Sequence, residues 1–215
     1  LEKWNQGLAV NLSSAFLLTK HAMINLRKQG IGGSLVYIAS KNAFSPGAGF
    51  GGYSVSKAGM LQLMRIAALE GGVAALLVSS GSAATTFAIL NLAEAGDHIV
   101  SSPSLYGGTY NLFHYTLPKF GVEVTFVDGK NINEWKKSVK KNTKIFFFET
   151  PSNPLLELID IKAVCNIASK HKIKTVIDNI FASPVLQKPV LLGADIIVYS
   201  GTKHIDGQGR VLGGA

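Results

Sequence analysis

The sequence predicts an α/β protein built on a mostly parallel sheet with flanking helices. Two observations indicate this class. From about residue 74 onward, short runs rich in Val, Ile and Phe alternate with longer segments of helical spacing. That alternation is typical of β-α-β units with right-handed crossovers. In addition, 47% of the 215 residues are hydrophobic, which is enough to bury the core of one large domain or two small ones.

The first 70 residues predict a separate α-β-α segment. Apolar residues recur at helical spacing over residues 2–26, and glycines at 30, 32 and 33 should end that helix. The run S-L-V-Y-I-A at 34–39 has the composition of a short buried strand. A loop rich in glycine and small residues (40–52) then leads into a second helix over 53–70.

The regular alternation begins after Gly71-Gly72. Strands are predicted at residues 74–78, 97–101, 122–126, 144–148, 174–178 and 195–199. Helices are predicted between them at residues 82–95, 108–120, 132–140 and 161–172.

The formal net charge of +8 does not by itself indicate nucleic-acid binding. The lysines are scattered, apart from five between residues 136 and 144 that alternate with polar positions as on a solvated helix face. A basic balance equally suits an enzyme of anionic substrates, so we expect no nucleic-acid partner.

The cysteine and apolar patterns favour a cytoplasmic protein. The single cysteine, Cys165, cannot form an internal disulfide, and it lies in a helical pattern as a small core residue. The five histidines show no ligand spacing, so we expect no metal. No apolar run is long enough to span a bilayer, and the first residues lack the features of a signal peptide. Because the chain begins without methionine, we expect it to start inside a longer reading frame.

A lone lysine follows the last predicted strand, in V-Y-S-G-T-K-H-I-D-G-Q-G at 198–209. Open α/β sheets bind ligands at the carboxyl ends of their strands. Partial desolvation there would make the amine of Lys203 a nucleophile or Schiff-base former. The ordinary alternative is an exposed loop lysine.

A second group of residues lies in the first 70. Tyr53 and Lys57 form Y-x-x-x-K at a helix start, which puts the phenol and the ammonium on one helix face. A nearby cation favours phenolate, and Ser40 at the end of the preceding strand can reach the same point. This arrangement suits acid/base work on a carbinol or ketone. The spacing alone occurs by chance in many helices.

These residues resemble those of the short-chain dehydrogenases/reductases. Two segments are similar to sequences of that family: L-A-V-N-L-S-S-A-F-L-L-T-K around Asn11, and V-Y-I-A-S-K-N-A around Ser40. I-A-S-K-N-A is most similar to the dehydrogenase part of bifunctional rhamnulose-phosphate aldolase/alcohol dehydrogenases. The resemblance implies that Tyr53 is the acid/base, Lys57 holds the nicotinamide ribose, Ser40 orients the carbonyl and Asn11 supports a proton relay. The resemblance covers about 70 residues. This segment lacks the glycine-rich turn that would bind NAD(P), so we expect dehydrogenase activity only as an alternative.

From about residue 65 onward the chain resembles the Cys/Met-metabolism family of pyridoxal-phosphate (PLP) enzymes, which are fold-type I proteins. Ser200-Gly201-Thr202-Lys203 matches the family's S-x-T-K. The resemblance implies that Lys203 forms the internal aldimine with PLP. Ser200 and Thr202 would contact the cofactor, Ser200 at its phosphate.

Further residues of that site occur in order along the chain. Asp178 ends the strand T-V-I-D, where its carboxylate would pair with the pyridinium nitrogen. Gly81 and Ser82 open a helix whose free N–H groups and dipole suit a phosphate. A helix cap or loop acid is the ordinary alternative for Asp178, and Gly-Ser at a helix start is common.

The remaining matches lie in S-L-Y-G-G-T-Y and F-F-E-T-P-S-N-P. By resemblance, Tyr106 would stack on the pyridine ring and act in proton transfer, although a lone tyrosine is more often half-buried packing. Asn153 would face the substrate carboxylate or the cofactor O3′, and Glu149 completes the set.

Within the family, L-Y-G-G-T-Y-N-L-F and H-I-D-G-Q-G-R-V-L-G-G are most similar to homoserine-ester sulfhydrylases. Those enzymes of methionine biosynthesis and transsulfuration eliminate the acyl group of O-acetyl- or O-succinylhomoserine and add a sulfur nucleophile at Cγ. The family's γ-lyases remain competing assignments. The resemblance implies a small amino-acid substrate, a homo-oligomer and no membrane partner.

The two resemblances meet in R-x-x-A-L-E-G-G at 65–72, which fits both families. We therefore expect a chimera: residues 1–70 as a dehydrogenase-like fragment, and 71–215 as an incomplete PLP large domain without the family's N-terminal arm or C-terminal domain. Three functions remain open: a PLP-dependent transferase or lyase, an NAD(P)-dependent oxidoreductase using Tyr53 and Lys57, and an inactive chimeric fragment.

Overall fold

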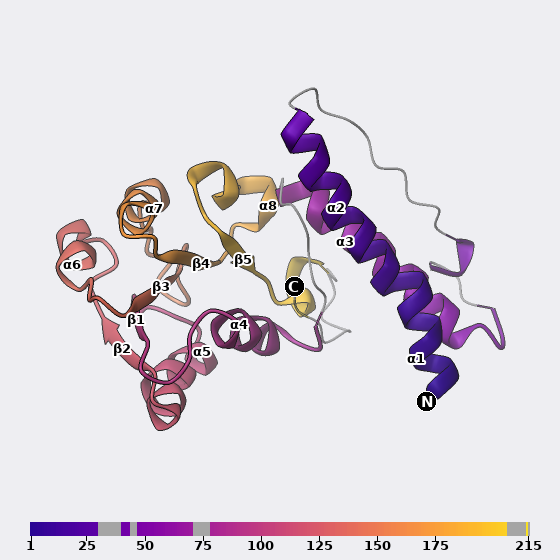
Figure 1. Ribbon diagram of the computed structural model, residues 1–215, viewed down its shortest axis with the longest axis horizontal. Helices are drawn as coiled ribbons and strands as arrows, with labels where there is room; N and C mark the ends of the chain where they lie inside the picture. Colours follow the sequence, from indigo (N-terminus) through magenta and orange to yellow (C-terminus); the bar gives the residue numbers. More distant parts are fainter. Residues whose placement is uncertain (30–39, 44–46, 71–77, 206–213, 215) are drawn as a thin grey trace. The chain divides into compact units, whose positions relative to one another are not determined.

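The computed structural model describes residues 1–29, 40–43, 47–70, 78–205 and 214. The chain forms two compact units, residues 1–77 and 78–215 (Figure 1). The domain boundary that the sequence places after residue 70 stays a prediction, because residues 71–77 lie outside the described part. No helix in the described part is long and apolar enough to cross a membrane.

The first unit consists of helices. Its elements are α1 (Glu2–Leu8), the π-helical turn η1 (Ala9–Ser13), α2 (Ser14–Gln29), the 3₁₀ turn η2 (Lys41–Ala43) and α3 (Gly51–Glu70). The two predicted helices are therefore confirmed, the first with a π-helical turn inside it. The strand predicted at 34–39 lies outside the described residues.

Two glycines of α3 allow it to lie close to the first helical segment. A Cβ at Gly59 would come within 2.9 Å of the Leu12 side chain, and one at Gly52 within 3.2 Å of the Trp4 ring. Small residues at such positions permit close helix packing.

The second unit is built on a parallel sheet of five strands, in the order β2-β1-β3-β4-β5. The strands are β1 (His98–Ser101), β2 (Glu123–Phe126), β3 (Thr143–Glu149), β4 (Lys174–Asp178) and β5 (Ile196–Val198). Five predicted strands and the α/β class are thus confirmed. Of the sixth, at 74–78, only Val78 is described, and it forms an isolated antiparallel bridge with Gly214.

The helices connect the strands as predicted, with different ends. They are α4 (Gly81–Leu90), α5 (Gly107–Asn111), the π-helical turn η3 (Leu112–Thr116), the 3₁₀ turn η4 (Leu117–Phe120), α6 (Ile132–Lys137), α7 (Ile161–Lys170), α8 (Ser183–Leu186) and the 3₁₀ turn η5 (Pro189–Leu192).

The helix predicted at 108–120 is wrong as a single α-helix, because it divides into α5, η3 and η4. Pro118 lacks an N–H group and cannot continue an α-helical ladder, which explains the 3₁₀ end. The helices predicted at 82–95 and 132–140 also end early, at Leu90 and Lys137. The sequence did not predict α8 or η5.

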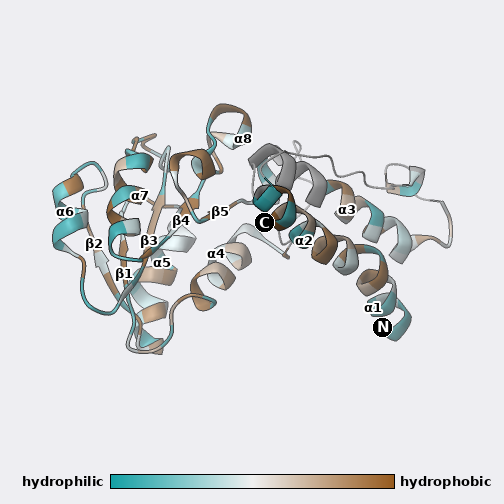
Figure 2. Cartoon of the chain, turned by 45° about the horizontal axis from the view of Figure 1, so that its top comes forward, coloured by the Kyte–Doolittle hydropathy of each residue, from teal (hydrophilic) through white to brown (hydrophobic). Residues whose placement is uncertain are grey.

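Side-chain alternation on β3 divides the core into two layers. Phe146 and Phe148 pack on one face of the sheet with Trp135 of α6 and residues of α7. Ile145 and Phe147 pack on the other face with α4 and the α5–η4 segment. Helices thus cover both faces of a sheet whose strands are apolar on both sides, and the outer sides of α6 and α7 carry hydrophilic residues (Figure 2).

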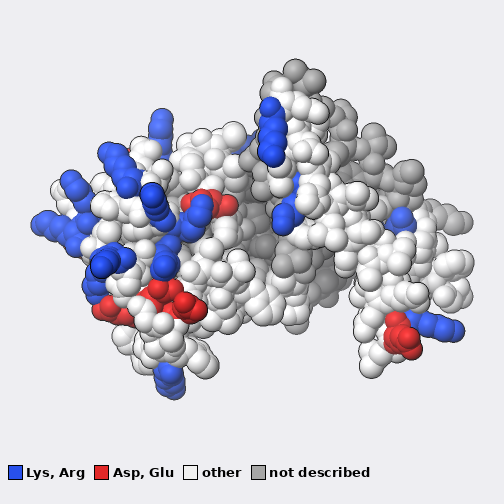
Figure 3. All heavy atoms as spheres, in the orientation of Figure 1, with Lys and Arg blue, Asp and Glu red and all other residues white. Residues whose placement is uncertain are grey.

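Cys165 is buried in the first of these layers, as predicted for a small core residue. The lysines between 136 and 144 are exposed. Figure 3 shows basic side chains gathered over the end of the second unit that holds α6, with a group of acidic side chains beside them. Ion pairs join Lys140 to Glu123 and Lys174 to Asp195, an arrangement that fits a solvated surface.

Candidate active site

A cavity of about 220 Å³ lies at the carboxyl ends of β3, β4 and β5. Its lining residues are Ser80, Gly81, Ser82, Thr85, Tyr106, Thr109, Glu149, Asn153, Asp178, Ile180, Ser200, Thr202 and Lys203. The structure thus brings all eight predicted PLP-site residues into one cavity, with Glu149 among them. Their individual roles stay predictions.

The start of α4 forms one wall of this cavity. Ser80 is the N-cap, and its Oγ accepts the N–H of Ala83 at 3.1 Å. The first amides of a helix have no acceptor within it, and the helix dipole is positive there, so the wall suits an anion such as a phosphate. Gly81 lies against Ser200. A Cβ atom added at residue 81 would lie 2.7 Å from the Cβ of Ser200.

Two carboxyl groups lie side by side at the ends of β3 and β4, because Glu149 and Asp178 are register partners. Burial raises the pKa of Asp178 to about 6, against the opposing effect of the Ile180 N–H at 3.0 Å. Burial also raises the pKa of Glu149 to about 8, and the charge of Asp178 adds to this increase. Neither carboxyl group has an ion-pair partner among the described residues.

Tyr106 is held at the start of α5. Its backbone N–H donates to Oε2 of Glu149 at 2.6 Å, while its side chain is 51% exposed. The ring lies across Gly108, where an added Cβ would come within 2.6 Å of Cε1. Gly108 therefore leaves room for the ring.

Lys203 follows β5 in the π-helical turn η6 (Gly201–Ile205), and its side chain is exposed. Its backbone departs from helical geometry (φ −90°, ψ −122°), and its N–H donates to the carbonyl of Ser200 at 3.3 Å. The lysine thus lies at the strand end where the sequence places it.

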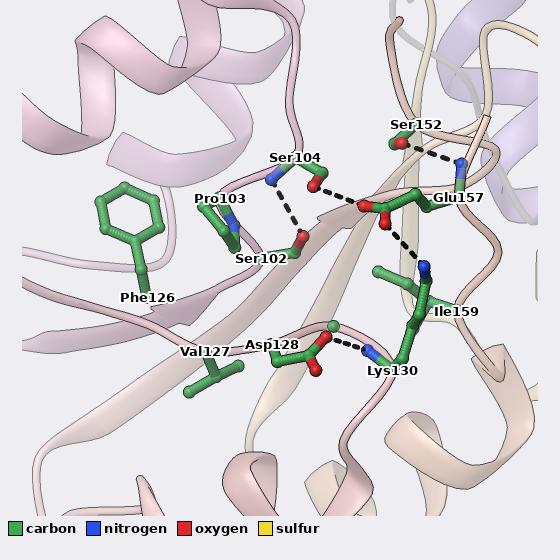
Figure 4. A pocket seen from close by; sticks show the side chains of 11 residues that line it. Ser102, Pro103, Ser104, Phe126, Val127, Asp128, Lys130, Ser152, Glu157 and Ile159 are labelled. Carbon is green, nitrogen blue, oxygen red and sulfur yellow. Dashed lines mark hydrogen bonds and ion pairs between the residues drawn. The ribbon is translucent and has the colours of Figure 1, made fainter. Parts of the chain in front are cut away.

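A polar network holds the loop that carries Asn153. Glu157 accepts from Lys130 Nζ at 2.6 Å and from Ser104 Oγ at 2.7 Å, and its N–H donates to Ser152 Oγ at 3.0 Å (Figure 4). These residues line a second cavity of about 330 Å³. The network joins the segment after β3 to the segment that leads into Tyr106.

Beyond Ser80, the N-cap that precedes the predicted Gly81, the sequence did not predict three lining residues: Thr85, Thr109 and Ile180. Thr85 lies four residues after Gly81, and Thr109 three residues after Tyr106. Helical spacing from the predicted site residues would have indicated both threonines.

The dehydrogenase-like residues belong to the first unit, and none of them is among the residues that line this cavity. Lys57 Nζ is 5.7 Å from the ring centroid of Tyr53, which agrees with the predicted shared helix face. Asn11 in η1 donates to the carbonyl of Gly7 at 3.0 Å, and Ser40 Oγ accepts the N–H of Asn42 at 3.2 Å. These hydrogen bonds are local.

Residues 55–215 match the family described as Cys/Met metabolism PLP-dependent enzyme. The chain belongs to this family. Residues 1–89 match the short chain dehydrogenase family, so the two matches overlap over residues 55–89. Both resemblances predicted from the sequence are confirmed, and the overlap includes the stretch where they were expected to meet.

Relatives in the Cys/Met-metabolism family match about 70% of this chain. The O-acetyl-L-homoserine sulfhydrylase of Leptospira meyeri is 50% identical over 150 residues, covering 70% of this chain and 34% of that protein. The L-methionine gamma-lyase of Fusobacterium nucleatum subsp. nucleatum is 45% identical over 151 residues, covering 70% and 38%. The chain thus spans little more than a third of these relatives.

Solved structures of the family share the fold. The putative O-acetylhomoserine (thiol)-lyase of Campylobacter jejuni, solved with N'-pyridoxyl-lysine-5'-monophosphate, has a TM-score of 0.70 and 42% identity. The match covers 72% of this chain and 38% of that one.

The cavity fits the cofactor that the family name identifies. Asp178 offers a carboxylate for a pyridinium nitrogen, and the start of α4 offers amides for a phosphate. The buried Oε1 of Glu149 has no hydrogen-bond partner among the described residues, so one polar atom of a lining residue is left unsatisfied.

Proposed function

We propose that the second unit binds pyridoxal 5′-phosphate and supports γ-elimination or γ-replacement on a sulfur amino acid or homoserine ester. The proposal rests on one observation above all: Asp178, Tyr106, Lys203 and the start of α4 line a single cavity. The bound cofactor would supply an electron sink for carbanion chemistry.

Each residue has a role suited to its place. Asp178 would keep the ring nitrogen protonated, because a carboxylate at the end of β4 favours a cation beside it. The amides of α4, with Ser200 and Thr202, would hold the phosphate. Lys203 would anchor the cofactor covalently and move protons at the substrate carbons, and Tyr106 would cover the ring.

Homoserine-ester sulfhydrylase is the activity favoured within this class, because an O-acetyl-L-homoserine sulfhydrylase is 50% identical over 150 residues. The γ-lyase alternative is supported by a relative that is 45% identical over 151 residues. The substrate would be a small amino acid, the working form a homo-oligomer and the compartment the cytoplasm.

The test is cofactor binding followed by borohydride reduction. The protein should gain a visible absorbance with pyridoxal 5′-phosphate, and reduction should fix the cofactor to the peptide that contains Lys203. Lys203→Ala should abolish both signals, while Lys162→Ala, at an exposed lysine of α7, should retain them. A colourless protein, or labelling that persists in Lys203→Ala, would refute the assignment.

An NAD(P)-dependent oxidoreductase is the second candidate, favoured by the match of residues 1–89 to the short chain dehydrogenase family. The placement of Lys57 near the Tyr53 ring supports it. It requires saturable NADH or NADPH binding, which fluorescence titration would detect. A chain that binds neither nucleotide nor pyridoxal 5′-phosphate would be the inactive chimeric fragment.

A further inference from the structure

Glu149 connects two residues of the candidate site. Its Oε2 accepts the backbone N–H of Tyr106 at 2.6 Å, and its backbone pairs in register with Asp178. The side chain is only 1% exposed. Burying a carboxyl group is unfavourable unless its oxygens are hydrogen-bonded, so packing alone does not account for a glutamate here.

The second carboxyl oxygen gives a separate indication. Oε1 is buried and has no hydrogen-bond partner among the described residues, although Glu149 lines the cavity. Two adjacent buried carboxyl groups do not both ionise readily. The pKa of Glu149, about 8, lies above that of Asp178, about 6. At neutral pH the proton therefore stays on Glu149 and the negative charge on Asp178.

A protonated carboxyl group has one accepting oxygen and one O–H donor. With Oε2 accepting the amide of Tyr106, the donor is at Oε1, the oxygen without a described partner. We propose that Glu149 is a positioning residue: its Oε2 fixes the backbone of Tyr106 at the wall of the cavity, beside Asp178. This inference rests on the proposed function and adds a residue to it.

The hydrogen bond from Tyr106 to Glu149 matters because the position of the Tyr106 ring depends on the position of its backbone. The ring lies against Gly108 at the start of α5. The N–H that donates a hydrogen bond to Glu149 is the backbone N–H of Tyr106 itself. Loss of that acceptor would release the residue that is expected to cover the cofactor ring. A glutamate that only filled space would be replaceable by leucine without this effect.

The experiment compares Glu149→Gln with Glu149→Leu. Glutamine copies the neutral acid, since its carbonyl can accept the Tyr106 amide and its NH₂ can donate. Leucine has similar bulk and does neither. Amide hydrogen exchange of Tyr106 is followed by NMR in the protein without cofactor, and binding of pyridoxine 5′-phosphate, which cannot react with Lys203, is measured by calorimetry.

We expect Glu149→Gln to keep Tyr106 exchange and probe affinity within about threefold of the parent. In Glu149→Leu we expect exchange at least about tenfold faster and affinity at least about tenfold weaker, as for a lost buried hydrogen bond. Glu94→Leu, at an exposed glutamate, is the control and should match the parent in both measurements.

Parent-like exchange in Glu149→Leu would overturn the inference, and so would fast exchange or a tenfold loss of affinity in Glu149→Gln. If the leucine variant fails to fold, the glutamine variant decides alone. If the parent does not bind pyridoxine 5′-phosphate, the proposed function fails, while the exchange data still decide whether Glu149 fixes Tyr106.

Discussion

Gly81 and Ser200 are in direct contact: a Cβ at residue 81 would lie 2.7 Å from Cβ and 2.9 Å from Cα of Ser200. The contact joins the first turn of α4 to the segment after β5, two walls of the candidate site. Because one obstructing atom belongs to the backbone, a rotamer change cannot relieve the overlap.

We therefore expect Gly81→Ala to displace the start of α4 and to weaken pyridoxal 5′-phosphate binding by at least about tenfold. An overpacked position of this kind typically costs about 1–3 kcal/mol of stability. Cofactor titration and denaturant unfolding would measure the two effects. Gly51→Ala, where the added methyl group meets nothing within 4 Å, is the control. Unchanged binding in Gly81→Ala would show that this contact does not shape the site.

The stability of the protein without cofactor should fall as pH rises from about 6.5 to 8. Burial raises the pKa of Glu149 from 4.5 to about 8, so between these values the folded state binds more protons than the unfolded state. Stability is then lost as pH rises, by up to about 1.4 kcal/mol per pH unit. Asp178, with a pKa of about 6, contributes the same sign only at lower pH.

His98 contributes the opposite sign. Burial lowers its pKa below 6.5, so its effect on stability ends near that pH. Glu149→Gln should therefore flatten the profile between about 6.5 and 8 in urea unfolding followed by circular dichroism. A slope that survives in this variant would assign the titration to another group.

Much of the fold could be predicted from the sequence. Strands that are buried on both faces of the sheet appear as short apolar runs, and each run is followed by a segment of helical spacing. The same logic places Asp178 and Lys203 at strand ends. The contact between Glu149 and the Tyr106 amide joins residues 43 positions apart. The spacing of apolar residues along the chain does not predict such a contact. The division of the segment after Gly107 depends on local geometry around Pro118, which apolar spacing does not reveal.

Glu157 should restrain the loop that carries Asn153. It binds Ser104 and Lys130 on segments that follow other strands. Glu157→Ala would remove both contacts, so we expect faster hydrogen exchange over residues 150–159 and weaker cofactor binding. Glu123→Ala also breaks a lysine pair, with Lys140, but away from the residues of either cavity. Equal effects of the two variants would indicate a general loss of surface charge pairing.

Phe147 should be among the residues on which the second unit depends most. It is fully buried between the sheet and the α4 side, with Phe113 edge-on at 4.8 Å between ring centroids. Phe147→Ala should cost about 3–5 kcal/mol, the sum of lost burial and the cavity left behind. A domain is typically stable by only about 5–15 kcal/mol, so the midpoint of chemical unfolding should fall sharply. Phe120→Ala, at a ring that is 66% exposed, should change stability by no more than about 0.5 kcal/mol. A similar small change in Phe147→Ala would contradict a core organised around the two faces of β3.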